Sequence, residues 1–231
     1  MNIAVMGTGM VGRAISSRLY ELGHKVVIGT RDVNTTMTRD EVDMAGNPPF
    51  SVWYKSYPEV ELVDFSEAAR QSEIIVNATN GSAAVSALNA AGKDNLRGKN
   101  IIDVSNPLDF SSGMTPQLLV KDDDSLGEQI QRAFPQSNVV KTLNTMNAHI
   151  MVRPGQLEAG EHTVFLSGND ENAKAQTAEL LRSFGWTDIF DLGDISSARG
   201  PEMYFRLWLL IFMKLEQVPF NIKVVRKVQD V

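Results

Sequence analysis

A glycine-rich turn between an apolar run and an amphipathic segment constrains this chain more than any other feature. Residues 3–6 are apolar without interruption, as expected of a strand that is buried on both faces. The chain continues Gly7-Thr8-Gly9-Met10-Val11-Gly12, a complete G-x-G-x-x-G. A helical pattern over 13–22 then stops at Gly23, and a second apolar run begins at Val26. Strand, glycine turn, helix and strand in this order predict a dinucleotide-binding unit.

Each glycine of the turn has its own role. Gly7 allows the tight turn, Gly9 lets a pyrophosphate approach the backbone, and Gly12 lets the helix pack closely on the strand. The helix N-terminus adds unpaired N–H groups and the positive end of its dipole. The alternative, a glycine turn that binds nothing, is disfavoured because the whole strand–turn–helix–strand context is present.

The end of the second strand favours NADP over NAD. Sites that select NAD usually place a carboxylate there, about 20 residues past the glycines, on the ribose 2′-hydroxyl. Here that position falls at Gly29, and Thr30 and Arg31 follow. A guanidinium can bind a 2′-phosphate, and the threonine hydroxyl can donate to it. Two alternatives stay open: Asp32 serves NAD if the register shifts, or Arg31 is a solvated turn residue.

Composition narrows the class of protein. The net charge of −6 argues against a general nucleic-acid surface, and the lack of cysteine excludes disulfides, thiolate metal sites and cysteine nucleophiles. Because the first strand starts at once, we expect no signal peptide. The longest apolar run, 207–213, is too short to span a bilayer. We therefore expect a soluble, cytoplasmic protein without membrane or nucleic-acid partners.

Alternating strands and helical segments predict an α/β fold, a doubly wound, mostly parallel Rossmann sheet. Further strands are expected at 60–64, 74–76, 101–104, 139–143, 162–166 and 187–191. Ser66 is expected to cap one helix, and Asp170 another that ends at Gly185. Because the pattern changes after Pro154, we predict an NADP-binding domain at 1–150 and a small C-terminal α/β domain at 151–231 that closes the cleft and dimerises.

Two segments fit this scheme less simply. Residues 32–60 form a long polar insertion with a weak helix at 38–45 and three aromatic residues at 53–57. This insertion borders the adenosine half of the site, or its aromatic residues only hold the loop against the rest of the protein.

Pro201 is expected at the first position of an apolar helix that ends at Lys214. Such a helix is buried, either in the core or against a second subunit, and we favour a dimer contact.

Polar residues follow three of the strands. Ligands of doubly wound sheets bind beyond the carboxyl ends of the strands, so 77–80, 105–106 and 144–147 should surround one crevice. Their amides and hydroxyls suit ribose and carboxamide groups, or they are ordinary turn formers and caps. The acidic run 122–124 is expected to be a solvated turn, so no metal site is predicted.

Several segments resemble, in the same order, NADPH-dependent reductases of the deazaflavin coenzyme F420 and their relatives. They are the glycine turn, Gly29-Thr30-Arg31, Asn77-Ala78-Thr79, Lys141-Thr142-Leu143-Asn144-Thr145 and 191–199. The resemblance covers nearly the whole chain and implies a two-domain protein with a cleft, often a homodimer. It also implies hydride transfer between nicotinamide C4 and a deazaflavin, with few or no acid–base side chains. No catalytic residue is therefore predicted; His149 is a proton donor or, in the favoured alternative, a positioning or packing residue.

We thus predict an NADP-dependent oxidoreductase that acts on a small-molecule acceptor, coenzyme F420 or a flavin. One alternative is a dehydrogenase of a small carbonyl or imine, with Arg199 binding a charged substrate. Another is a non-catalytic NADP(H) sensor that signals through the helix at 201–214. The residues predicted to bind the cofactor are Gly7, Thr8, Gly9, Met10, Val11, Gly12, Thr30, Arg31, Asn77, Ala78, Thr79, Ser105, Asn144, Asn147 and Ala148.

Overall fold

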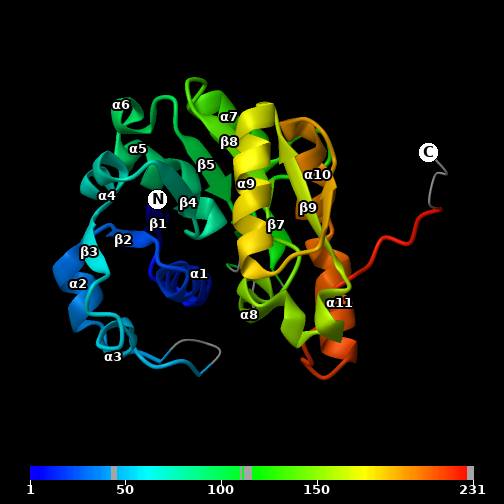
Figure 1. The fold of residues 1–231 in the computed structure, drawn as a ribbon, viewed down its shortest axis with the longest axis horizontal. Helices are drawn as coiled ribbons and strands as arrows, with labels where there is room; N and C mark the ends of the chain where they lie inside the picture. The colour runs from blue at the N-terminus through cyan, green and yellow to red at the C-terminus, as the bar shows by residue number, and fades with distance from the viewer. Residues whose placement is uncertain (43–45, 110, 112–115, 228–231) are drawn as a thin grey trace.

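One twisted sheet runs through the whole molecule (Figure 1). The computed structural model describes residues 1–231 except 43–45, 110, 112–115 and 228–231. The sheet has eight strands in the order β10-β9-β8-β5-β4-β1-β2-β3. In chain order they are β1 (Asn2–Met6), β2 (Lys25–Thr30), β3 (Glu61–Asp64), β4 (Ile74–Asn77), β5 (Asn100–Asp103), β8 (Asn138–Thr142), β9 (Thr163–Gly168) and β10 (Asp188–Asp191). Only the β8–β9 pair among these is antiparallel, which confirms the mostly parallel α/β fold.

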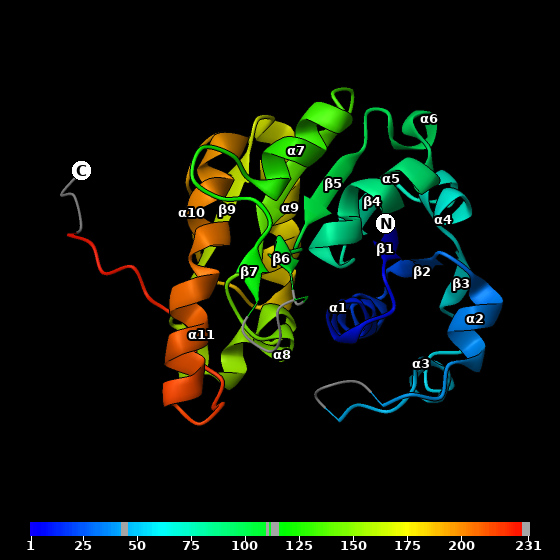
Figure 2. The same ribbon diagram turned by 180° about the vertical axis from the view of Figure 1, so that it is seen from behind.

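Helices cover both faces of the sheet (Figures 1 and 2). The side chains of β1 alternate between two apolar clusters, Ile3 and Val5 in one and Ala4 and Met6 in the other. The first cluster packs under α1 (Met10–Glu21), α8 (Ala148–Val152) and α9 (Glu171–Phe184). The second packs under α4 (Phe65–Gln71), α5 (Ala84–Ala91) and α7 (Leu126–Ala133).

Shorter elements complete the chain. They are the helices α2 (Val33–Thr38), α3 (Phe50–Tyr54), α6 (Lys93–Leu96), α10 (Arg199–Met203) and α11 (Phe205–Lys214), the hairpin β6 (Leu108–Asp109) and β7 (Gln117–Leu118), and 3-10 turns at Gly81–Ala83, Pro154–Gln156, Glu158–Gly160 and Ile195–Ala198. In the described part of the chain, no helix combines the length and apolar character needed to cross a bilayer. The division at residue 150 stays a prediction, and β9 and β10 of the C-terminal part continue the same sheet.

Three local predictions are corrected by the structure. The insertion carries its helix at Val33–Thr38, while 39–42 are not helical and the rest of the predicted segment, 43–45, lies outside the described residues. Asp64, not Ser66, caps α4, because its carboxylate accepts the N–H of Glu67. Pro201 is the third residue of α10, and Tyr204 separates that helix from α11.

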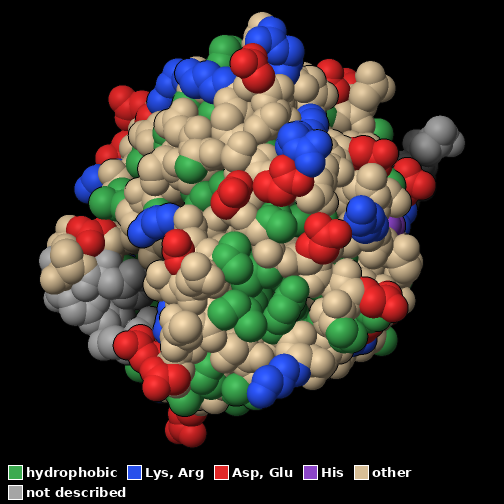
Figure 3. All heavy atoms as spheres, turned by 90° about the vertical axis from the view of Figure 1, so that its left-hand side faces the viewer, with side chains coloured by type: hydrophobic (Ala, Val, Ile, Leu, Met, Phe, Trp, Pro, Cys, Tyr) green, Lys and Arg blue, Asp and Glu red, His purple; other side chains and the backbone are tan. Residues whose placement is uncertain are grey.

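One face of the molecule shows its charged side chains mixed. The face at the left of Figure 1 carries acidic and basic side chains scattered around a small hydrophobic patch (Figure 3), so neither sign of charge dominates it. This mixed pattern agrees with the net charge of −6.

Candidate functional site

The glycine turn has the geometry that its sequence predicts. Gly7 has a φ of +118°, and a Cβ there would lie 2.6 Å from the carbonyl oxygen of Ala78. A Cβ at Gly12 would lie 2.1 Å from the carbonyl oxygen of Gly7, so the helix packs on the turn itself. A Cβ at Gly9 would meet nothing within 4 Å. The N-terminus of α1, which has no side-chain cap and no acidic residue in its first turn, is therefore open to an anion.

A pocket of about 770 Å³ lies in front of this turn. Seven of the predicted cofactor-binding residues line it: Gly7, Thr8, Gly9, Thr30, Arg31, Ala78 and Thr79. Its other walls come from the insertion, α4, the loop after β4 and α5, through Asp32, Thr35, Thr36, Arg39, Phe65, Asn80, Ala83, Ser86, Ala87 and Ala90. The pocket is large enough for much of a dinucleotide, which would run along the carboxyl ends of the strands.

The charged groups at the end of β2 favour a phosphate. A Cβ at Gly29 would lie 2.6 Å from Met6 Sδ, so no carboxylate fits at that position. Asp32 caps α2, because its carboxylate accepts the backbone N–H of Thr35, and this bond lowers the Asp32 pKa. Arg31 and Arg39 both line the pocket. Arg39 is not among the residues predicted from the sequence to line the pocket. A signal was present: Asp32 three residues before Thr35 is a helix-capping pattern, and the short helix that it predicts returns the chain to the pocket at Arg39.

Thr30 is less available than expected. It is 6% exposed, and its hydroxyl lies 2.7 Å from the Thr36 hydroxyl, which itself donates to the carbonyl of Asp32. The Thr30 hydrogen is therefore directed at Thr36, and only its oxygen lone pairs are left for a ligand. Its predicted role as a donor to the 2′-phosphate thus requires a rearrangement of this bond.

The polar residues after β4 and β5 form one hydrogen-bonded group, as predicted for a common crevice. The Thr79 hydroxyl donates to Asn77 Oδ1 over 2.7 Å, and Asn77 Nδ2 donates to Asp103 Oδ1 over 2.8 Å. The Ser105 hydroxyl also donates to Asp103 Oδ1, over 2.7 Å. The Thr79 and Ser105 hydroxyls both donate their hydrogen to protein atoms. Toward a ligand they can therefore act only as acceptors, for ribose hydroxyls or a carboxamide N–H.

A buried ion cluster supports this group from behind. Lys141 Nζ lies 2.7 Å from Asp103 Oδ2, 2.6 Å from the Ser105 carbonyl oxygen and 2.8 Å from Glu202 Oε1, and all three charged side chains are at most 2% exposed. Burial alone would lower the Lys141 pKa, but the two carboxylates together raise it above its ordinary value. Lys141 is thus a charged residue that holds Asp103 in place; in the sequence it stands out as a lysine within an apolar strand and as the first residue of a segment that carries the family resemblance.

The two asparagines after β8 differ in how much of their side chain is left for a ligand. Asn144 donates both amide hydrogens to protein atoms, to Asn106 Oδ1 at 3.0 Å and to the Pro201 carbonyl oxygen at 3.1 Å. Only the Asn144 side-chain oxygen is therefore left for the predicted contact with the cofactor. Asn147 Oδ1, in contrast, is buried and has no hydrogen-bond partner among the described residues. A buried acceptor without a partner is a candidate to take an N–H from a ligand once neighbouring side chains move to expose it.

The remaining predicted residues lie at or beside the start of α1. Met10 and Ala148 line a second cavity together with His149, while Val11 packs against the first apolar cluster. Burial lowers the His149 pKa, so its ring is neutral at physiological pH. Arg199, the cation proposed for a charged substrate, instead donates to both Glu128 oxygens, over 2.9 and 2.6 Å.

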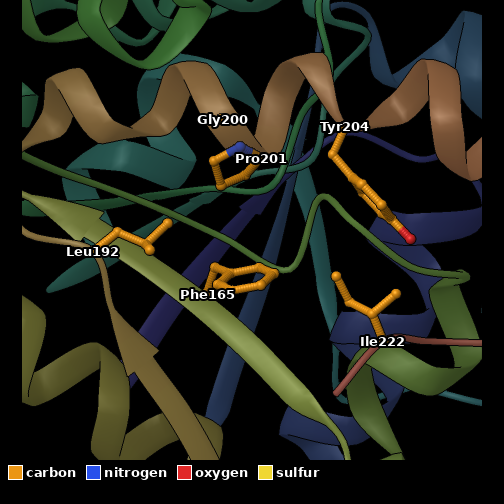
Figure 4. A pocket seen from close by; sticks show the side chains of 6 residues that line it. All are labelled: Phe165, Leu192, Gly200, Pro201, Tyr204 and Ile222. Carbon is orange, nitrogen blue, oxygen red and sulfur yellow. The ribbon is translucent and has the colours of Figure 1, made fainter. Parts of the chain in front are cut away.

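A third cavity, of about 230 Å³, lies away from these groups (Figure 4). Phe165 of β9, Leu192, Pro201 of α10 and Ile222 of the C-terminal segment surround it with apolar surface, and the Tyr204 hydroxyl points away from Phe165. It offers no charge to bind a nucleotide. Among the described residues, no group of His, Asp or Glu is placed to hold a metal ion.

Comparison with known proteins points in the same direction as the geometry. The family model described as NADP oxidoreductase, coenzyme F420-dependent, matches residues 2–107. A crystal structure from Arthrobacter sp. FB24, provisionally described as an F420-dependent NADP-reductase, is 51% identical with a TM-score of 0.93 and covers 98% of this chain and 100% of its own.

More distant matches share part of the chain or the fold alone. Metalloreductase STEAP3 from Rattus norvegicus is 28% identical over 200 residues, which are 87% of this chain and 35% of that protein. This chain thus spans about a third of the length of that curated relative. Pyrroline carboxylate reductase of Plasmodium falciparum, crystallised with NADP bound, has a TM-score of 0.53 at 16% identity over 94% of this chain and 70% of its own, and shares the fold.

Proposed function

Because the chain belongs to the family of coenzyme F420-dependent NADP oxidoreductases, we propose that it moves a hydride between NADP(H) and a deazaflavin or flavin-like acceptor. The observation that carries the proposal is the pocket in front of the open N-terminus of α1, with Arg31 and Arg39 in its lining. When bound, the nicotinamide supplies a hydride at C4, and this hydride with one proton from water reduces the acceptor ring by two electrons.

The protein contributes orientation rather than acid–base chemistry in this proposal. The glycine turn and the first N–H groups of α1 would hold the pyrophosphate, and Arg31 and Arg39 would hold the 2′-phosphate. Thr79 and Ser105 would accept from ribose hydroxyls, and Asn147 Oδ1 from a carboxamide. Lys141 and Asp103 would keep these acceptors in place.

The carbonyl or imine alternative has less support. It relied on Arg199 as a fixed cation for a charged substrate, but that guanidinium is bound to Glu128. The imine reductases with a similar fold are only 12–16% identical to this chain and therefore indicate the fold alone.

A paired assay tests the proposal. Purified protein and NADPH are offered oxidised coenzyme F420 and, separately, FMN or FAD, and acceptor and NADPH are followed together. We expect NADPH oxidation to match loss of the deazaflavin or flavin absorption. Tight NADPH binding without turnover of any of these acceptors would reject the acceptor class and leave a different substrate or the sensor.

A further inference from the structure

The second cavity, beside α1, has walls from three distant parts of the chain. It encloses about 300 Å³ and is lined by Met10, Arg13, Ala14 and Ser17 of α1, by Ala148 and His149 of α8, and by Asn47, Pro48 and Trp53 of the insertion. Figure 1 shows α1 flanked by α8 on one side and by the insertion with α3 on the other. The insertion therefore contributes a wall that a compact Rossmann unit would lack.

This wall is fixed before any ligand arrives. Arg13 donates to the carbonyl of Pro48 over 2.6 Å, which ties the insertion to α1. The Trp53 ring packs between Phe50 and Tyr57, with centroids 5.3 and 4.7 Å away. The Tyr57 ring in turn packs edge-on against Tyr20 of α1, at 5.7 Å. A preorganised aromatic surface loses little entropy when a ring binds to it.

The cavity adjoins the place where the reactive end of the nucleotide belongs. Met10 directly follows Gly9, which lines the nucleotide pocket, and Ala148 follows β8 at the carboxyl edge of the sheet. A dinucleotide whose pyrophosphate lies on the glycine turn would bring its nicotinamide to this edge. A volume of about 300 Å³ suits a ring system, not a second dinucleotide.

From these contacts we propose that the cavity receives the ring of the hydride acceptor and that Trp53 is a specificity-determining residue for it. The inference rests on the proposed function and adds to it the place where the fused ring of the acceptor binds and the residue of the insertion that contacts it. Trp53 and the flexible, exposed Met10 present polarizable, nonpolar surface, which a flat ring covers and a small carbonyl compound does not.

Tryptophan fluorescence gives a test that does not depend on turnover. Oxidised coenzyme F420 or FMN is titrated into protein saturated with NADP⁺, and tryptophan quenching and acceptor anisotropy are recorded. The variants are Trp53→Phe, Trp53→Ala and the matched control Trp208→Phe, whose ring lies on α11 against Phe212. We expect the quenched fraction of the emission to fall in Trp53→Phe, which keeps Trp186 and Trp208, and not to fall in Trp208→Phe. In Trp53→Ala the acceptor Kd should rise about three- to tenfold, with the NADP⁺ Kd unchanged.

Three results would overturn the inference in different ways. A quenched fraction as large in Trp53→Phe as in wild type, or an unchanged acceptor Kd in Trp53→Ala, would place the ring elsewhere while the proposed function stands. Equal quenching of Trp53 by NADP⁺ alone would assign the cavity to the nicotinamide. If wild-type protein neither binds nor reduces either acceptor, the proposed function itself fails.

Discussion

At the scale of single residues, the end of β2 is where we propose that the preference for NADP is set. Asp32 is the one feature of the sequence that favoured NAD, and its carboxylate caps α2. Arg31 and Arg39 approach the same pocket from both ends of that short helix. A cap oxygen held by a backbone N–H is less free to bind a ribose diol, whereas two guanidinium groups are suited to a dianionic 2′-phosphate.

Arg31→Ala should weaken NADPH binding by about 1.5–3 kcal/mol and leave NADH binding nearly unchanged, because it removes hydrogen bonds to a charged group. Kd values for both nucleotides, measured by calorimetry, check this. Asp32→Asn is the matched control: asparagine also caps helices, so the preference for NADPH should persist. Equal losses for both nucleotides in Arg31→Ala would show that Arg31 does not contact the phosphate.

At the scale of elements, buried charges connect pieces of the chain that no local pattern connects. Glu202 of α10 accepts the N–H groups of Leu126 and Gly127 at the start of α7, over 2.7 and 3.0 Å, and also pairs with Lys141 of β8. Lys141 also donates to Asp103 of β5, which accepts from Asn77 and Ser105 at the carboxyl ends of the strands. The C-terminal helices are thereby attached to the residues that are proposed to orient the ribose.

Glu202→Ala should lower the free energy of unfolding by about 3–5 kcal/mol, because it leaves Lys141 short of one carboxylate and two helix N–H groups without an acceptor. Chemical denaturation measures the change. Glu171→Ala is the control: its carboxylate is exposed, and its partner Lys174 keeps Asp191, so stability should change by less than about 1 kcal/mol. A similar small loss in Glu202→Ala would mean that the cluster is not stabilising.

The Arg199–Glu128 pair should make stability depend on pH. Hydrogen bonds from Arg199 lower the Glu128 pKa from its ordinary 4.5, although burial opposes them. Because the Glu128 pKa is lower in the folded protein than in the unfolded chain, the ionised carboxylate stabilises the fold at pH values above the pKa of the unfolded chain. This contribution is lost as the pH falls through the pKa of the folded protein. Arg199→Ala should therefore cost about 1 kcal/mol at neutral pH.

This difference from wild type should shrink as the pH falls below about 4.5, while the KM for the acceptor stays unchanged. Unfolding curves at a series of pH values, together with steady-state kinetics, measure both. A stability difference that is the same at about pH 7 and about pH 3, or a raised KM, would contradict the structural role of Arg199.

Local signals predicted the nucleotide-binding unit, because the glycine spacing and both apolar runs lie within one short segment. The same holds for α9, where Asp170 caps the helix and Gly185 ends it in the left-handed conformation, as expected. The hydrogen-bonded proximity of the polar residues after β4, β5 and β8 was also predictable, since the carboxyl ends of parallel strands meet at one edge.

Errors arose where several local signals competed or partners were far apart. Asp32 fits both a ribose ligand and the cap of α2, and the structure has it as the cap. Asp64 and Ser66 are both suitable caps for α4, and the structure uses Asp64. The pairing of Lys141 with Glu202 leaves no trace in local sequence because it depends on how β8 and α10 meet in space.

At the scale of the whole molecule, α11 has an apolar surface that the described residues of this chain leave exposed. None of its residues is buried, and Leu207, Leu210 and Met213 are 54%, 69% and 60% exposed. The helix therefore does not belong to the core of the single chain, which was one of the two predicted places for it. A second copy packed on this face remains our proposal, in line with the expected homodimer.

Leu210→Glu should convert a dimer into a monomer, because a charge would be buried in the proposed contact. Analytical ultracentrifugation of wild type and variant reports the mass. Val52→Glu, at an apolar position on α3 that is 50% exposed, is the control and should leave the mass unchanged. A wild-type monomer at all concentrations would reject the proposed dimer, and a dimer whose mass depends on NADPH would favour the sensor.

The most direct test of hydride transfer uses NADPH deuterated at nicotinamide C4, in separate samples for the two faces of the ring. Each is incubated with the protein and oxidised coenzyme F420, and the reduced deazaflavin is examined by mass spectrometry. Because a deazaflavin receives the hydride on carbon, the label should not wash out into water. We expect one deuterium in the product from one of the two samples. Reduced product without deuterium from either sample would contradict direct transfer between the two rings.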